Sequence, residues 1–391
     1  MVSLEEALAL IDEMRAAFYD VLPVEEIPVE AAVGRMLAAD VISRANLPAY
    51  DTCTMDGYAL RAADGYPLHI IGEAFAGRGF RKIGAGEAVY VTTGARLPTG
   101  ADAVLQVEHA RVDGDALYGI PLRPGTFIVR TGADLKSGEM LLQKGRIIAP
   151  AMAGVLRAGR VDRVAVYRKP HVAVIATGDE IRDGTVADAN GPMVCAMLEA
   201  WGCEAERMSP VGDNLANLER AIGSALQDHD MVLTIGGVSM GQKDLTSSAV
   251  KSGEVIFKGV RVKPGKPFIA SYIDRKPVFS LPGKPSGSYV AMELMVRRFL
   301  LGDSRRRTVS IPISQDVELS EGFEYVVFIE LRDGMAQPVG YEGSSIEMFH
   351  SPEYITSLLS TSTRTVLADG YFISRGTVRA GQPVSVHLLL T

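Results

Sequence analysis

The stretch HVAVIATGDE, residues 171–180, decides the fold class of the central part of the chain. It is a short apolar run that ends in a glycine turn with two carboxylates. Three further strand patterns follow it, with helical patterns between and after them: CEAERMSPVGD (203–213), DMVLTIGGVSMG (230–241) and PVFSLPGKPSGS (277–288) as strands, and 190–202, 214–228 and 287–300 as helices. Alternating apolar strands and helices are typical of a parallel sheet covered on both faces. We therefore predict an α/β domain here.

The flanking segments have a different texture. Residues 3–20 follow helical spacing, and Ser3 with Glu6 forms a capping box at its start. Between about 48 and 148, short β-rich runs alternate with Gly/Pro turns, which predicts a small all-β, barrel-like domain. The last ~85 residues return to short strands, which predicts a small C-terminal β domain.

Composition excludes several classes of function. The 391 residues carry a net charge of −7, whereas a protein that grips nucleic acid usually has a basic face. No apolar run approaches the ~18 residues of a membrane span, and the N-terminus does not resemble a signal peptide. Three sparse cysteines fit reduced thiols. We expect a soluble, cytoplasmic protein that binds neither nucleic acid nor membrane.

Polar residues follow the predicted strands at the edge where α/β sheets bind ligands. They are Thr177-Gly178-Asp179-Glu180, Gly212-Asp213, Gly236-Gly237-Val238-Ser239 with Asp244 further on, and Pro282-Gly283-Lys284. The glycines allow backbone N–H groups to approach an anion. Carboxylates of Glu180, Asp213 and Asp244 at one rim would suit Mg²⁺, which binds through few carboxylates plus phosphates and water.

A basic loop precedes the last strand. Lys258, Arg261, Lys263 and Lys266 lie within nine residues on a chain shaped by Pro and Gly. This local positive patch in an acidic protein fits a phosphorylated or oxyanion ligand.

Each motif also has a plainer explanation. Asp179 can cap a strand-to-helix turn, Asp213 with Asn214 can cap the helix that follows, and a KPGKP segment is often a solvated turn. A second set of polar residues, Asp56, Thr93 and Asp134, lies on turns of the β-rich segment. These residues either serve only to form the turns or belong to a lid that meets the α/β pocket.

The ordered motifs resemble the MoeA family, the molybdopterin molybdenumtransferases, over essentially the whole chain. They are Met55-Asp56-Gly57-Tyr58-Ala59, Thr93-Gly94-Ala95, Gly100-Ala101-Asp102-Ala103-Val104, Thr177-Gly178-Asp179-Glu180, Gly236-Gly237-Val238-Ser239, Lys263-Pro264-Gly265-Lys266-Pro267 and Leu281-Pro282-Gly283.

The resemblance implies four regions and a reaction. The regions are an elongated linker and dimerisation region (1–45 and 136–167), a β-rich lid domain (46–135), an α/β molybdopterin-binding domain (168–302) and a C-terminal β domain (303–391). The reaction is insertion of molybdate into adenylated molybdopterin, with Mg²⁺-assisted hydrolysis and release of AMP. A homodimer is implied, as is substrate transfer from a MogA-like adenylyltransferase.

The resemblance also assigns roles by matching motif. The implied catalytic set is Asp56, Thr93, Asp134, Glu180, Asp213 and Asp244, of which Glu180, Asp213 and Asp244 would hold Mg²⁺. The implied substrate-binding set is Thr177, Gly178, Gly236, Gly237, Ser239, Lys263, Gly265, Lys266, Pro282, Gly283, Lys284 and Ser344.

Several positions depart from the family pattern. Lys284 stands where an asparagine is usual, Tyr325 and Glu330 stand where two arginines are usual, and Leu245 stands where an aromatic residue is usual. The first three motivate one alternative to the enzyme, a non-catalytic pterin- or nucleotide-binding or scaffold paralogue. A further alternative is a divergent enzyme that uses tungstate.

Overall fold

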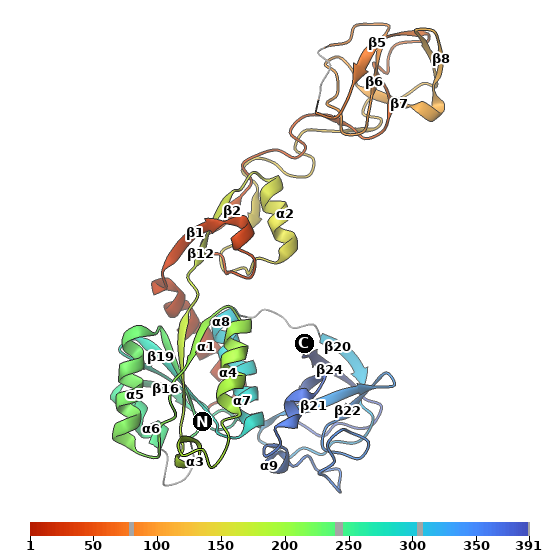
Figure 1. The fold of residues 1–391 in the computed structure, drawn as a ribbon. Helices are drawn as coiled ribbons and strands as arrows, with labels where there is room; N and C mark the ends of the chain where they lie inside the picture. The colour runs from red at the N-terminus through yellow and green to blue at the C-terminus, as the bar shows by residue number, and fades with distance from the viewer. Residues whose placement is uncertain (78–81, 239–244, 303–307, 390–391) are drawn as a thin grey trace. The chain divides into compact units, whose positions relative to one another are not determined.

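The computed structural model describes residues 1–77, 82–238, 245–302 and 308–389. By their contacts the residues form two compact units, Met1–Pro23 with Arg168–Thr391, and Val24–Tyr167. Figure 1 traces both units along the chain.

A six-stranded sheet forms the centre of the first unit, in the order β14-β13-β15-β19-β18-β16. Its first four strands are mutually parallel, as predicted: β14 (Glu204–Arg207), β13 (His171–Ala176), β15 (Met231–Ile235) and β19 (Lys276–Leu281). The other two are β18 (Ile269–Ile273), which pairs antiparallel with β19, and β16 (Glu254–Lys258), which pairs antiparallel with β18. The sheet is therefore mixed, because β18 and β19 form a hairpin. Its two turn residues, Asp274 and Arg275, both have positive φ, as tight hairpin turns require.

Helices cover both faces of this sheet (Figure 1). On one face lie α5 (Leu215–Asp228) and α6 (Leu245–Ala249), where Leu218 and Ile222 pack on Ile175, Val232 and Val278 of the strands. On the other lie α4 (Asn190–Ala200) and α7 (Pro285–Ala291), and α7 continues through a π-helical turn (Met292–Val296) into α8 (Arg297–Leu301). Among the described residues, no helix is long and apolar enough to cross a membrane.

The N-terminal helix α1 (Leu4–Val21) starts as the sequence predicts. Ser3 accepts a hydrogen bond from the Glu6 N–H, and Glu6 accepts one from the Ser3 N–H, so the capping box is confirmed. The helix packs on α8: the ring centroids of Phe18 and Phe299 lie 5.0 Å apart, and Arg298 donates to Asp12 at 2.6 Å. By their contacts, residues 1–23 group with 168–391. The predicted region boundaries stay predictions.

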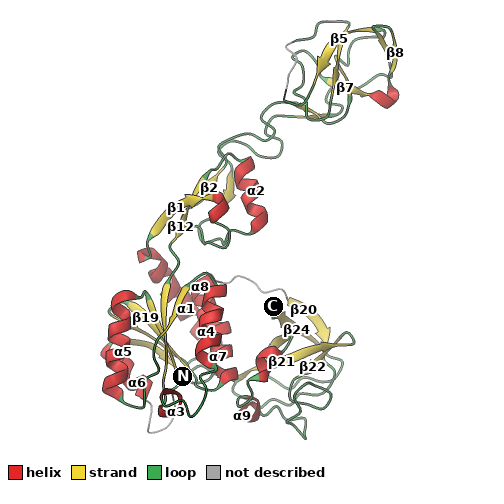
Figure 2. Cartoon of the chain, viewed as in Figure 1, coloured by secondary structure: helices red, strands yellow, loops and turns green. Residues whose placement is uncertain are grey.

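The C-terminal part is the expected small β domain (Figure 2). Its sheet has the order β17-β21-β23-β24-β20, and β22 pairs with β21. The elements are β20 (Thr308–Pro312), β21 (Glu324–Arg332), β22 (Met335–Pro338), α9 (Thr356–Leu359), β23 (Gly370–Ser374) and β24 (Pro383–Leu388). The first strand of that order, β17 (Val262–Lys263), belongs to the basic loop, and its Lys263 pairs in parallel with Tyr325. The lysine loop is thus part of the C-terminal sheet.

The second unit is β-rich, as predicted. Its main sheet has the order β7-β4-β6-β5-β9-β8. The strands are β4 (Gly57–Leu60), β5 (Leu68–Ala74), β6 (Glu87–Val91), β7 (Ala103–Gln106), β8 (Arg111–Asp113) and β9 (Ala116–Tyr118). The described residues of this unit also form α2 (Pro150–Ala158) and the ladders β1 (Val24–Pro28) with β12 (Arg163–Tyr167), β2 (Val41–Ile42) with β11 (Met140–Leu142), and β3 (Thr52–Cys53) with β10 (Ile128–Val129). Buried Cys53, Val89 and Val104 belong to its core.

Candidate functional site

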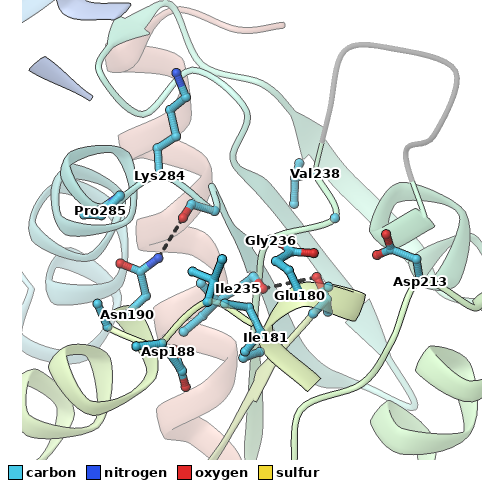
Figure 3. A pocket seen from close by; sticks show the side chains of 18 of the residues that line it. Glu180, Ile181, Asp188, Asn190, Asp213, Ile235, Gly236, Val238, Lys284 and Pro285 are labelled. Atoms are coloured by element: carbon cyan, nitrogen blue, oxygen red, sulfur yellow. Dashed lines mark hydrogen bonds between the residues drawn. The ribbon is translucent and has the colours of Figure 1, made fainter. Parts of the chain in front are cut away.

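The carboxyl ends of β13, β15 and β19 meet at one edge of the central sheet. The Thr177 N–H donates to the Ile235 carbonyl at 2.8 Å, and the Gly236 N–H donates to the Leu281 carbonyl at 3.1 Å. Beyond these strand ends lies a cavity of about 530 Å³, shown in Figure 3. We call it the acidic compartment. The predicted residues that line it are Thr177, Gly178, Glu180, Asp213, Gly236, Gly237, Gly283 and Lys284.

The local hydrogen bonds decide which carboxylates are structural. Asn214 caps α5, because its side chain accepts from the Asn217 N–H at 3.0 Å. Asp179 accepts from the Asp213 N–H at 3.2 Å and lies 2.9 Å from Arg182. Asn214 therefore caps α5, and Asp179 stabilises the turn. Glu180 and Asp213 line the cavity with exposed side chains.

The glycine pair after β15 is required by close packing. Gly237 has a φ of +65°, and a Cβ at this position would lie 2.5 Å from Oγ1 of Thr246. That hydroxyl is engaged, since it donates to the Gly236 carbonyl at 3.0 Å. Only glycine fits this turn, so backbone atoms and no side chain line the cavity at this position.

Glu180 and Asp213 present carboxylates, the ligands through which Mg²⁺ binds when phosphate and water supply its other ligands. A Mg²⁺ site at these two residues stays a prediction. Within the described residues, no group of three His, Cys, Asp or Glu side chains is arranged to hold a metal. Asp244, the third predicted ligand, and Ser239 lie outside the described residues.

Asp188 and Asn190 are among the lining residues that were not predicted from the sequence. The Asn190 amide donates to the Gly283 carbonyl at 2.7 Å and so joins the start of α4 to the Pro-Gly-Lys turn (Figure 3). Asp188 accepts from the Gly191 N–H at 2.8 Å. The sequence signal that could have found them is a capping residue just before a helix. Many helices that have no functional role begin with the same signal.

A second cavity, of about 570 Å³, shares Val238, Gly283 and Lys284 with the first. We call it the basic compartment. Its predicted lining residues are Lys263, Gly265, Lys266, Pro282, Gly283 and Lys284. The C-terminal domain adds Tyr325, Tyr354, Ser357 and Ser360, of which only Tyr325 was singled out from the sequence. No local motif marks these two serines, because only the tertiary fold brings them to the lysines.

Aromatic rings hold the two loop lysines. The Lys263 ammonium lies 4.1 Å from the ring centroid of Phe323 and donates to the Tyr325 hydroxyl at 3.4 Å. The Lys266 ammonium lies 5.6 Å from the same Phe323 centroid. Cation–π contacts of this kind orient an ammonium group without neutralising it. Tyr325 therefore belongs to the basic compartment although it carries no charge there.

The serine motif of the C-terminal domain occupies a structural position. Ser344 is buried, accepts from the Gly340 N–H at 3.1 Å and donates to the carbonyls of Tyr341 and Ile346. It lines neither compartment. Glu330 accepts hydrogen bonds from the neighbouring Ser345. Burial would raise the pKa of Glu330, but these bonds and the adjacent Arg332 outweigh burial and lower it.

The predicted residues of the second unit form a local pair and a separate turn. Asp56 accepts from the Thr93 N–H at 2.6 Å and from the Thr93 hydroxyl at 2.9 Å, and these two bonds lower the pKa of Asp56. Asp134 is exposed, and its N–H donates to the Leu47 carbonyl. The role of all three in the site stays a prediction.

Comparisons with known proteins agree with this architecture. A family model described as "MoeA N-terminal region (domain I and II)" matches residues 2–159, and one described as "Probable molybdopterin binding domain" matches residues 173–302. The molybdopterin molybdenumtransferase of Haemophilus influenzae is 30% identical, over 97% of this chain and 99% of its own length. That of Staphylococcus aureus strain COL is 32% identical, over 71% of this chain and 70% of its own.

A solved structure gives the same result. The crystal structure of the molybdopterin biosynthesis MoeA protein from Pyrococcus horikoshii aligns over 100% of both chains, with a TM-score of 0.77 and 30% identity. The matches cover the α/β domain with its two compartments and the β-rich unit alike. The chain therefore belongs to the MoeA family of molybdopterin molybdenumtransferases, enzymes of molybdenum-cofactor biosynthesis.

Proposed function

We propose that this enzyme inserts molybdate into adenylated molybdopterin, with hydrolysis of the phosphoanhydride and release of AMP. The observation that carries the proposal is the direct contact between an acidic and a basic compartment, which share Val238, Gly283 and Lys284. A substrate that carries a phosphoanhydride and meets a free oxyanion needs both environments side by side.

The acidic compartment suits the anhydride end of the substrate. Backbone N–H groups of the glycine turns can approach phosphate oxygens closely, because no side chain intervenes. Glu180 and Asp213 would hold Mg²⁺, which when bound offsets the negative charge of phosphate oxygens. In the basic compartment, Lys263 and Lys266 would stabilise the charge of molybdate.

The setting of the enzyme follows from the same proposal. We infer that a MogA-like adenylyltransferase supplies the adenylated pterin, and that the enzyme works as a homodimer. We also propose the cytoplasm as its compartment. Cys53, Cys195 and Cys203 are all unpaired, as is usual in a reducing environment.

One assay separates this enzyme from a non-catalytic binding protein. Purified protein is mixed with adenylated molybdopterin, molybdate and Mg²⁺, and AMP release is followed. We expect AMP release from the wild type. Tight pterin binding by folded protein without AMP release would refute the enzyme, and the same assay with tungstate tests the second alternative.

The site assignment is tested by Glu180→Gln, which we expect to abolish AMP release without changing the circular dichroism spectrum. The matched control is Glu219→Gln, because Glu219 is an exposed glutamate of α5 that lines neither compartment. Equal activity in both variants would remove Glu180 from the site.

A further inference from the structure

Among the residues that the structure describes, Lys284 is the one charged residue that lines both compartments. Its backbone adjoins the acidic compartment, where its neighbour Gly283 accepts the Asn190 amide. Its side chain extends away from Glu180 and Asp213, as Figure 3 shows. The ammonium group donates to the Ser360 hydroxyl at 3.2 Å, on the wall of the basic compartment. Lys284 therefore places its charge in the basic compartment.

The contact with Ser360 is a weak, neutral one. The Ser360 hydroxyl donates its own proton to the Ser357 carbonyl at 3.0 Å, so it meets Lys284 with a lone pair only. Ser360 is buried at 7% exposure and fixed at the end of α9, so it holds the ammonium near the cavity without cancelling its charge. An anionic oxygen would be a stronger partner for the same ammonium group.

The basic compartment is lined by three cations, and few negative charges balance them. The ammonium groups of Lys263, Lys266 and Lys284 contact aromatic rings and hydroxyls, which are neutral. Among the described residues that line this cavity, Glu353 is the only carboxylate. Charges gathered around a cavity without matching opposite charges favour a multiply charged anion.

We propose that Lys284 is a specificity-determining residue: it is the third cation of the basic compartment, and its ammonium exchanges Ser360 for an oxygen of a free tetrahedral dianion. This inference rests on the proposed function, which places molybdate at Lys263 and Lys266. It adds that the α/β domain contributes a third cation from the Pro-Gly-Lys turn. The dianion thus contacts the turn that also borders the acidic compartment.

The test measures binding of sodium molybdate alone, by isothermal titration calorimetry, to the full-length protein. Loss of one charge-assisted hydrogen bond predicts that Lys284→Asn weakens molybdate binding about tenfold. Lys284→Arg, which keeps the charge, should restore most of the affinity. Ser360→Ala should bind molybdate at least as tightly as the wild type, because it removes the contact that competes for the Lys284 ammonium.

Two controls make the result specific. Lys169→Asn removes an exposed lysine that precedes β13, at the opposite end of the strand, and should leave molybdate binding unchanged. AMP titrated alone should bind Lys284→Asn and wild type equally. A loss of AMP affinity with unchanged molybdate affinity would overturn the inference, because Lys284 would then serve the nucleotide.

The inference and the proposed function can fail separately. If Lys266→Ala loses molybdate while Lys284→Asn does not, the third cation is refuted and the proposed function stands. If wild type releases no AMP but Lys284→Asn still weakens molybdate binding, the proposed function is refuted and the oxyanion site stands. If wild type binds no molybdate at millimolar concentration, the inference is refuted outright.

Discussion

Gly178 controls where the Glu180 carboxylate lies, so a side chain at position 178 should change both the stability and the activity of the enzyme. Gly178 has φ +133° and ψ 135°, a conformation that other residues adopt at a cost of about 1–3 kcal/mol. A Cβ at this position would lie 2.7 Å from Oε1 of Glu180, whereas ordinary contact begins at 3.4 Å, so the carboxylate must retreat by about 0.7 Å.

Gly178→Ala should therefore change stability and activity together. We expect the free energy of unfolding to fall by about 1–3 kcal/mol, measured by urea denaturation. AMP release should fall about 10- to 100-fold, because a displacement near 1 Å of a positioned group can cost that much. Both follow from one methyl group at one position.

A second glycine separates strain from displacement. Gly184 also has positive φ, +73°, but a Cβ there would have no neighbour within 4 Å. Gly184→Ala should lose about 1 kcal/mol of stability and keep AMP release within about twofold of the wild type. Equal activity of the two alanine variants, whether both high or both low, would refute the role given to Gly178.

Three further predictions concern other parts of the chain. Thr93→Val removes the hydroxyl donor to Asp56 but keeps the stronger backbone donor, so NMR titration should show the pKa of Asp56 rising only part of the way to its ordinary value. A carboxylate whose pKa is lower in the folded than in the unfolded state stabilises the protein above the unfolded pKa, and this stabilisation is lost as the pH falls. Because the pKa difference is smaller in the variant, the variant should lose less stability than the wild type on acidification. An unchanged pKa would contradict this. Gly57→Ala would place a Cβ 2.0 Å from the Leu105 carbonyl oxygen, across the β4–β7 pair, and should lose about 1–3 kcal/mol in urea unfolding, so a wild-type midpoint would disprove the clash. Tyr354→Phe would leave two buried backbone groups of β21 without their hydroxyl partner and should also cost about 1–3 kcal/mol, which a thermal melt without a shift would exclude.

Much of the fold could be read from local patterns. The capping box of α1 and the four strand patterns that begin with HVAVIATGDE predict elements that the structure contains, because both signals depend on nearby residues. The β18–β19 hairpin was missed. Its turn, Asp274–Arg275, has positive φ at residues that rarely adopt it, so nothing local announced a hairpin. The grouping of α1 with α8 depends on packing between residues nearly 300 positions apart.

The site was predictable to the extent that it lies at strand ends. Topology alone brings Glu180, Asp213 and the glycine turns to one edge, and the sequence shows that topology. It could not show which of two adjacent polar residues caps a helix, as Asp213 and Asn214 illustrate. Nor could it show that Ser344 would be enclosed in its own turn, or that Ser357 and Ser360 would reach the lysines, because both depend on the packing of the C-terminal domain.

The pairing of β17 with β21 has a thermodynamic consequence. Since Lys263 pairs with Tyr325, the lysine loop supplies one strand of the C-terminal sheet. Under the proposed function, an anion bound by the loop lysines is therefore held by an element of that sheet as well. Binding of the anion and docking of the C-terminal sheet on the loop are then linked: each favours the other by the same free energy.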